Sequence, residues 1–347
     1  MQTKYWIVDN HVDNLKSYSQ LEEAAAYLRD NETVAFPTET VYGLGANATN
    51  DAAVRKIYEA KGRPSDNPLI VHIASKSQLN YITENVPEKA GKLMDAFWPG
   101  PLTLIFQKKQ GALSSLVTAG LDTVAVRMPA HPVALAVIEK SGLPIAAPSA
   151  NTSGKPSPTT AKHVFQDLNG KIAGIVDGGA AGVGVESTVL DCTGNVPVIL
   201  RPGGITREQL EAVIGTVRSD ASLIDPNEAP KSPGMKYKHY APQAELTLVN
   251  GSPEFLQSLI DERRAEGFKV GVLTTEENAD FYRADEVLTA GSRSDLGSVA
   301  SGLYGALRRF DELNVQIIFG ETYPVEGMGQ AVMNRLTKAA GHRMISE

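Results

Sequence analysis

Residues 37–47 read Pro37-Thr-Glu-Thr-Val-Tyr-Gly-Leu-Gly-Ala-Asn47, and they carry more information than any other stretch of the chain. They follow Thr33-Val-Ala-Phe36, which predicts a buried strand. Residues 61–69, Lys61-Gly-Arg-Pro-Ser-Asp-Asn-Pro-Leu69, place two cations beside a turn. Backbone N–H groups of a glycine-bearing loop and fixed cations together suit an anion. The two stretches therefore predict a site for a small, phosphate-bearing molecule.

The bulk composition predicts a soluble globular protein long enough for two domains. The chain has 347 residues, 42% of them apolar and 21% charged. Its net charge of -7 argues against generic binding of nucleic acid, which excess cations drive. The lone Cys192 excludes an internal disulfide and a cysteine-based zinc cluster, and a small buried hydrophobic side chain is its expected role. We find neither a signal-peptide pattern nor an apolar run of about 20 residues, and we expect a cytoplasmic protein with no membrane contact.

The order of strand and helix patterns predicts an α/β fold in two domains. Within residues 1–215 several strands follow one another without helices, which predicts a twisted mixed parallel and antiparallel sheet with flanking helices. Residues 216–243 are rich in proline and predict a linker. Residues 244–347 alternate strands and helices, which predicts a smaller parallel, Rossmann-like domain. The aromatic and basic side chains of 232–242 suggest that the linker either lies on a functional surface or only packs on a domain.

Capping patterns mark several helix ends. Ser19-Gln-Leu-Glu22 and Thr206-Arg-Glu-Gln209 each read as a capping box that opens a helix. The helix over 53–60 is expected to stop at Gly62. Lys61 and Arg63 then stand at a helix C-terminus, where the dipole favours cations by about 0.3–1 kcal/mol. These two cations are either cap residues or a clamp for a triphosphate.

Two arginines end apolar strands, which is unusual because an unpaired buried guanidinium is costly. Arg127 and Arg201 are either structural ion-pair partners or receptors for an anion at the strand ends. The hydroxyl-rich loop 148–158 after a buried strand suggests a phosphate or ribose site. Ser187 lies either in a hairpin turn or in a loop that enters the site. His72 lies in a strand, where a core histidine is the more common case.

In order along the chain, these motifs resemble those of the threonylcarbamoyl-AMP synthase (YrdC-like) family in its two-domain form. The matching stretches are 37–47, 61–73, 98–104, 123–129, 144–158, 186–188, 200–203 and 232–242. The resemblance implies a YrdC-like catalytic domain and a linker that folds over the active site. It also implies synthesis of L-threonylcarbamoyl-AMP and pyrophosphate from L-threonine, bicarbonate and ATP. The product serves the threonylcarbamoyladenosine modification of tRNA position 37.

The family's motifs carry residue roles onto matching positions of this sequence. The resemblance implies that Lys61, Arg63 and Arg127 are the catalytic cations. It implies an L-threonine site of Thr40, His72, Arg127 and Ser187. It implies an ATP site of Lys61, Arg63, Asn67, Thr123, Ser149, Asn151, Ser157, Arg201 and Tyr237, with Tyr237 reaching back from the linker. It further implies Mg²⁺ without naming its ligands, a downstream tRNA threonylcarbamoyl transferase machinery, and a weak contact with tRNA.

The implied chemistry suits a chain without a convincing catalytic base. The attacking N-carboxylate is already an anion, so positioning and charge neutralisation carry the reaction. Three alternatives remain. The first is a non-catalytic RNA-binding module, against which the net charge argues. The second is a hydrogenase-maturation carbamoyltransferase, against which the single cysteine argues. The third concerns only the trailing domain, which could regulate the enzyme or dock a partner.

Overall fold

The structure is a computed structural model, and it describes residues 2–9, 15–220 and 239–347. The chain forms two compact units. The first comprises Met1–Ser153, Pro158–Gly182 and Glu186–Lys236, and the second comprises Gly154–Ser157, Val183–Val185 and Tyr237–Glu347. Two short segments from the middle of the chain thus belong to the second unit. The domain boundaries expected at 215 and 243 stay a prediction.

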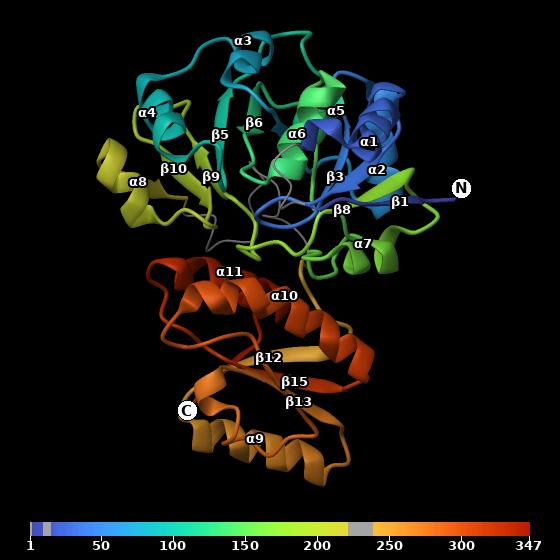
Figure 1. Ribbon diagram of the computed structural model, residues 1–347. Helices are drawn as coiled ribbons and strands as arrows, with labels where there is room; N and C mark the ends of the chain where they lie inside the picture. Colours follow the sequence, from blue (N-terminus) through green and yellow to red (C-terminus); the bar gives the residue numbers. More distant parts are fainter. Residues whose placement is uncertain (1, 10–14, 221–238) are drawn as a thin grey trace. The chain divides into compact units, whose positions relative to one another are not determined.

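The first unit contains one large sheet with helices on both of its faces (Figure 1). Its strands are β1 (Lys4–Ile7), β2 (Val34–Phe36), β3 (Gly43–Asn47), β4 (Ile70–His72), β5 (Leu102–Gln107), β6 (Thr123–Arg127), β7 (Ile145–Ala146), β8 (Gly174–Asp177), β9 (Thr188–Asp191), β10 (Val198–Arg201) and β11 (Arg218–Ser219). Its helices are η1 (Leu15–Ser17), α1 (Ser19–Arg29), α2 (Asp51–Lys61), η2 (Lys76–Gln78), α3 (Leu79–Ile82), α4 (Glu88–Phe97), α5 (Ser115–Thr118), α6 (Pro132–Ser141), α7 (Ala161–Leu168) and α8 (Arg207–Ile214).

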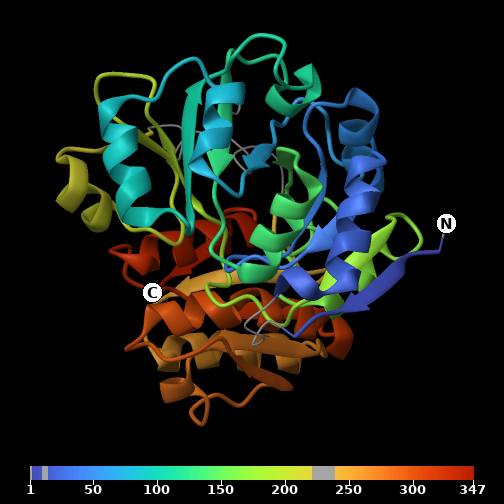
Figure 2. The same cartoon turned by 45° about the horizontal axis from the view of Figure 1, so that its top comes forward.

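The strand order is β1-β8-β2-β3-β7-β4-β6-β5-β9-β10-β11. β4 and β6 pair in parallel, whereas β2 pairs with β3 and β5 with β6 in antiparallel fashion. The predicted mixed sheet is therefore confirmed. α1 and α6 lie side by side (Figure 2), and their buried side chains join those of β2 and β8 in one core. A second, larger core packs α2, α4, α7 and α8 against other sheet residues.

The glycine-bearing stretch is not a phosphate-binding loop along its whole length, which corrects the sequence-based interpretation. Residues 43–47 form the buried strand β3, and β3 pairs with β2 on one side and β7 on the other. A Cβ on Gly45 would lie 2.5 Å from the Phe36 ring and 2.9 Å from Ile145. Glycine is needed here because two neighbouring side chains fill the space above the backbone. N–H groups of this stretch already donate to the sheet and to loop 148–158. Leu44 N, for example, donates to the Pro148 carbonyl oxygen.

Helix ends follow the sequence signals in two cases and depart from them in one. Gly62 adopts the left-handed conformation, with φ of 61°, and ends α2 as predicted. Thr206 and Gln209 form the capping box that opens α8. The box predicted at Ser19 is wrong: Tyr18 is the N-cap of α1 and makes no side-chain cap hydrogen bond. Ser19 is already inside the helix, and its hydroxyl contacts the Gln20 side chain instead.

The second unit contains a five-stranded sheet in which every pair of strands is parallel, as predicted. Its strands are β12 (Glu245–Asn250), β13 (Val270–Thr274), β14 (Glu286–Thr289), β15 (Ile317–Glu321) and β16 (Met344–Ser346), and its helices are α9 (Pro253–Ala265), η4 (Glu276–Asn278), α10 (Leu296–Leu313) and α11 (Met328–Ala339). In Figure 1, α9 covers one face of this sheet and α10 and α11 cover the other. The sequence did not predict β14 or β16, edge strands that are largely accessible and therefore lack a buried apolar pattern.

The predicted linker is described only at its two ends. Residues 218–219 form β11, which pairs with β10 and extends the first sheet. Tyr240 has a φ of 64°, and its ring stacks on Tyr304 within the second unit. Residues 221–238, and with them Tyr237, lie outside the described residues. Among the helices that the structure describes, none has the length and apolar character to span a bilayer.

Candidate active site

Two predicted threonine residues and two predicted ATP residues stand on or next to the parallel pair β4 and β6. His72 lies opposite Arg127 at the carboxyl ends of the two strands. Thr123 begins β6 at the other end, and Asn67 precedes β4 there. Four residue steps along a strand amount to ~13 Å. The backbone positions of these two pairs of residues therefore lie at opposite ends of β4 and β6.

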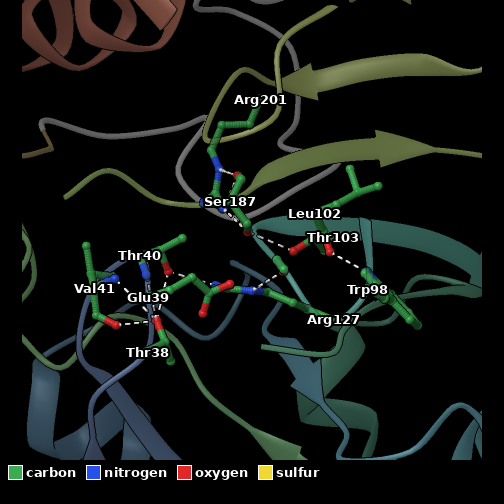
Figure 3. Close-up of polar contacts among 11 residues, drawn as sticks. Thr38, Glu39, Thr40, Val41, Trp98, Leu102, Thr103, Arg127, Ser187 and Arg201 are labelled. Atoms are coloured by element: carbon green, nitrogen blue, oxygen red, sulfur yellow. Dashed lines mark hydrogen bonds and ion pairs between the residues drawn. The ribbon is translucent and has the colours of Figure 1, made fainter. Parts of the chain in front are cut away.

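Arg127 is a buried side chain, only 4% exposed, with several polar contacts. Its Nη1 donates to Thr40 Oγ1 at 2.8 Å, and its Nε donates to the Gly100 carbonyl oxygen at 3.3 Å. Thr40 Oγ1 lies 2.8 Å from Thr38 Oγ1, which in turn donates to the Val41 carbonyl oxygen at 2.6 Å. Figure 3 shows these side chains pointing toward one another from the 38–41 segment and from β6. The predicted pair Thr40 and Arg127 is thus in direct contact.

Glu39 is a candidate site residue that the sequence analysis did not include. Its Oε1 lies 2.7 Å from Arg127 Nη2, which makes the two side chains an ion pair (Figure 3). The orientation is not that of a hydrogen bond, because both carboxylate oxygens and Nη2 are buried without a hydrogen-bond partner in the part of the chain that the structure describes. An ionised carboxylate can accept about four hydrogen bonds, and leaving it unsatisfied in a buried place is costly. The carboxylate is therefore placed to receive donors from a bound molecule.

A second polar network joins Arg201, Ser187 and Thr103. Arg201 Nη2 donates to the Ser187 carbonyl oxygen at 2.9 Å and to its hydroxyl at 3.2 Å. The Ser187 hydroxyl lies 2.8 Å from that of Thr103. Thr103 stands opposite Arg127 in the antiparallel pair β5 and β6, so the two networks are neighbours on the sheet. Thr103 was missed because it lies in a largely apolar strand.

His72 is buried as a neutral side chain at the carboxyl end of β4. Burial, reinforced by the charge of Arg127, lowers its pKa to about 3. Its Nδ1 lies 3.3 Å from the Ile70 carbonyl oxygen, a partner that suits a protonated ring nitrogen. A neutral imidazole next to Arg127 can orient a substrate hydroxyl but cannot add a second positive charge.

Lys61 organises the loop that follows β7. It is 2% exposed, and its Nζ donates to the carbonyl oxygens of Ser149 and Asn151, each at 2.5 Å. Nζ also lies 3.3 Å from Asn151 Oδ1, which accepts from the Ser149 hydroxyl at 2.6 Å. The structure thus brings three of the predicted ATP residues together. It also gives Lys61 a structural role that the sequence did not show.

Of the remaining predicted ATP residues, Arg63 and Asn67 lie together, since Arg63 Nη2 donates to the Asn67 carbonyl oxygen at 3.4 Å. Arg63 Nη2 donates to the Pro68 carbonyl oxygen at 3.2 Å, and Asn67 Oδ1 is buried without a hydrogen-bond partner among the described residues. Ser157 is fully buried in the segment 154–157 of the second unit. Tyr237 lies outside the described residues. The ATP roles of all these positions stay predictions.

The described residues contain no group of three or more His, Cys, Asp or Glu side chains that could hold a metal ion. A protein cage of the kind that binds Ca²⁺ or Zn²⁺ does not match this donor set. Mg²⁺ commonly binds through substrate phosphates and water with one or two carboxylates, and that mode needs no such cage. Burial raises the pKa of the Cys192 thiol to about 12, so this side chain stays protonated, in keeping with its expected role as a small buried hydrophobic group.

The comparisons define the class of protein to which this fold and these residues belong. A family model described as "Telomere recombination" (Sua5/YciO/YrdC) matches residues 26–203. A second model, described as "Threonylcarbamoyl-AMP synthase, C-terminal domain", matches residues 205–341. The first unit carries the mixed sheet and most of the candidate site residues, and the second carries the parallel sheet.

The chain belongs to the threonylcarbamoyl-AMP synthase (Sua5/YciO/YrdC) family, in its two-domain form. It is 63% identical over 345 residues to the threonylcarbamoyl-AMP synthase of Bacillus subtilis, covering 99% of this chain and all of the relative. It is 51% identical over 327 residues to that of Pyrococcus abyssi, covering 93% of this chain and 94% of the relative. The crystal structure of P. abyssi Sua5 complexed with L-threonine matches with a TM-score of 0.93 and 48% identity, covering 99% of this chain and 100% of that one.

Proposed function

We propose that this chain makes L-threonylcarbamoyl-AMP and pyrophosphate from L-threonine, bicarbonate and ATP. The observation that carries the proposal is the buried Arg127–Glu39–Thr40 cluster beside the Arg201–Ser187–Thr103 network. These two networks occur in a chain that is closely similar to a Sua5 whose crystal structure contains L-threonine. The charges of the cluster match a zwitterionic amino acid better than they match a nucleic acid. We therefore do not favour the RNA-binding alternative.

The threonine site that we propose uses both partners of the ion pair. Arg127 binds the substrate carboxylate, as charge complementarity and bidentate geometry favour. Glu39 accepts hydrogen bonds from the α-ammonium group, because its two oxygens lack donors among the described residues. Thr40, Ser187 and neutral His72 offer hydroxyl and imidazole groups for the threonine hydroxyl. A site that hydrogen-bonds this hydroxyl selects sharply against valine.

The proposed ATP site extends from the other end of the strand pair to the loop that Lys61 holds. Lys61, Arg63 and Asn67 serve the phosphates, and Ser149, Asn151, Thr123, Ser157, Arg201 and Tyr237 complete the nucleotide contacts. Mg²⁺ arrives with ATP as part of the substrate and neutralises phosphate charge. Arg201 contacts Ser187, and Ala150 N donates to the Tyr42 carbonyl oxygen close to Thr40, so the proposed nucleotide site adjoins the proposed threonine site.

The proposed reaction balances without a strong protein base. The threonine ammonium group and bicarbonate form an N-carboxylate, releasing one water and one proton, and Glu39 is placed to accept that proton. An oxygen of the N-carboxylate then bonds to the α-phosphorus of ATP. The bond from this phosphorus to the bridging oxygen breaks, and pyrophosphate leaves with the electron pair. Catalysis rests on positioning two anions among cations.

The direct test incubates the full chain with ATP, Mg²⁺, bicarbonate and labelled threonine, and detects the adduct by mass spectrometry. We expect a threonylcarbamoyl-adenylate and one pyrophosphate per adduct. Pyrophosphate release that is independent of threonine, with no adduct, would contradict the proposal. We further propose that the protein acts in the cytoplasm, where a tRNA threonylcarbamoyl transferase machinery consumes the adduct and where tRNA contacts the protein weakly at most.

A further inference from the structure

The second unit has a small cavity of about 220 Å³ at one edge of its parallel sheet. Its floor is formed by the ends of β12 and β15, where Val249 stands opposite Glu321. Its walls come from the start of α9, from residues 278 and 282 around η4, and from Arg293. Both strands are parallel, so their carboxyl ends meet at this edge. Open α/β sheets bind their ligands at this edge.

The cavity also lies where the topology reverses direction. The sheet order is β14-β13-β15-β12-β16, so β12 and β15 are neighbours. From β12 the chain crosses by α9 to β13 on one side, whereas from β15 it crosses by α11 to β16 on the other side. Right-handed crossovers in opposite directions place their helices on opposite faces, and Figure 1 shows α9 on the face opposite to α11. The connections therefore leave a crevice between β12 and β15, which is the usual ligand position in such folds.

Glu321 supplies a buried negative charge to this cavity. It is 6% exposed, and its Oε1 accepts from Tyr282 Oη and from Asn278 Nδ2, each at 2.7 Å. Burial and this hydrogen bond raise the pKa of Tyr282, so its hydroxyl remains a donor. Its Oε2 is buried and accepts no hydrogen bond from the described residues. One side of the carboxylate is therefore held in place while the other needs a donor.

Arg293 supplies a positive charge that is only loosely paired with Glu321. Its Nη1 lies 3.5 Å from Glu321 Oε2, whereas its Nη2 donates to the Thr322 carbonyl oxygen at 3.1 Å. The guanidinium also lies 5.5 Å from the centre of the Tyr323 ring. The side chain is 44% exposed, so part of it faces outward. Nη2 is thus directed at a backbone carbonyl oxygen, and the carboxylate receives no hydrogen bond from this guanidinium among the described residues.

Two features argue against a phosphate or a nucleotide. The N-terminus of α9 adjoins the cavity, but the Glu347 carboxylate already accepts from Ser252 N at 2.7 Å and from Ser252 Oγ at 3.0 Å. A second anion at this helix end would be repelled. The volume is also below the roughly 300–1,000 Å³ of sites for drug-sized ligands. A small molecule with both an amine and a carboxylate fits the two charges and the size.

We propose that this cavity binds a free α-amino acid, with its ammonium group on Glu321 and its carboxylate on Arg293. The site belongs to the second unit alone, so it is distinct from the catalytic residues and does not depend on the reaction proposed above. It gives the trailing domain a ligand of its own. An enzyme that consumes an amino acid could in this way respond to amino acid supply.

The test uses calorimetry on the full chain, with each proteinogenic amino acid added singly as the probe. The Arg127→Ala background reduces amino acid binding at the catalytic residues, and all titrations are made below the thermal unfolding transition of this variant. In this background we compare Glu321→Gln and Arg293→Gln with Glu286→Gln, a carboxylate of the same sheet that lies outside the cavity lining. Hydrogen bonds to charged groups contribute about 1.5–3 kcal/mol, which corresponds to a loss of about 10- to 100-fold in affinity.

We expect at least one amino acid to bind Arg127→Ala with one site per chain. Glu321→Gln and Arg293→Gln should each weaken this binding by the stated factor, and Glu286→Gln should leave it unchanged. Arg293 is half-exposed, so its variant tests the proposal even if Glu321→Gln lowers the melting temperature. Binding that is equal in all variants, binding of inorganic phosphate or adenosine only, or the absence of amino acid binding would overturn the proposal.

Discussion

Glu39 Oε1 and Arg127 Nη2 lie 2.7 Å apart in a buried place, yet neither atom has a hydrogen-bond partner in the part of the chain that the structure describes. Two opposite charges that touch without hydrogen bonding are only partly satisfied. A bound zwitterion could donate hydrogen bonds from its ammonium group to Glu39 and accept hydrogen bonds from Arg127 with its carboxylate. The proposed threonine site rests on this relationship between Glu39 and Arg127.

Arg127→Ala should weaken threonine binding by at least about 10- to 100-fold, because a charged hydrogen-bond partner of the substrate is lost. It should also lower the free energy of unfolding by about 3–5 kcal/mol, since Glu39 is left as an unpaired buried charge. Calorimetry with L-threonine and denaturant unfolding measure the two effects. Arg207→Ala is the matched control, because that side chain forms an exposed pair with Glu211. Normal threonine affinity in Arg127→Ala would refute the role given to this residue.

Lys61→Met should damage both ATP use and stability. The substitution keeps an unbranched side chain but removes the donors to the Ser149 and Asn151 carbonyl oxygens. Each buried carbonyl left unsatisfied costs about 1–3 kcal/mol. ATP-dependent pyrophosphate release and thermal unfolding are the measurements, and Lys56→Met, at a half-exposed lysine paired with Glu32, is the control. If ATP dependence and melting temperature were both unchanged, Lys61 would be neither clamp nor loop anchor.

Because His72 is buried as a neutral side chain, we expect the free energy of unfolding to fall as the pH is lowered. Its pKa is about 3 in the folded chain and about 6.5 when exposed, so the unfolded chain binds more protons between these values. Stability that is present above pH ~6.5 is therefore lost as the pH falls toward 3. One proton per chain gives a slope of about 1.4 kcal/mol per pH unit. His72→Gln should reduce the slope of unfolding free energy against pH by this amount; an identical slope would show that the imidazole titrates normally.

The sequence predicted the features that depend on local pattern. The stop of α2 at Gly62, the capping box at Thr206 and the parallel second sheet all follow from residue type and spacing. Strand β3 was missed because Gly43 and Gly45 read as a loop, whereas the Phe36 ring fills the space that a side chain would need. Only the packed structure shows that contact.

Site residues within recognisable motifs could be predicted from the sequence. Those that join the site only through tertiary packing could not. Arg127 stood out because a guanidinium ends an apolar strand. Glu39 was overlooked because an acidic residue within a hydroxyl-rich stretch usually faces water, and only tertiary packing buries it against Arg127. Thr103 could not be predicted because it is a neighbour of Arg127 only through the antiparallel register of β5 and β6. The proposed role of Tyr237 remains a prediction because Tyr237 lies outside the described residues.

The most direct measurement compares the binding of L-threonine with that of (R)-3-hydroxybutyrate, which is threonine without its amine, in the wild-type chain and in Glu39→Gln. We expect the wild type to prefer threonine by about 10- to 100-fold, because the ammonium group meets the Glu39 carboxylate. In Glu39→Gln this preference should largely vanish while the affinity for (R)-3-hydroxybutyrate stays the same or rises. An undiminished preference for threonine in Glu39→Gln would contradict the account, since the ammonium group would then be bound elsewhere.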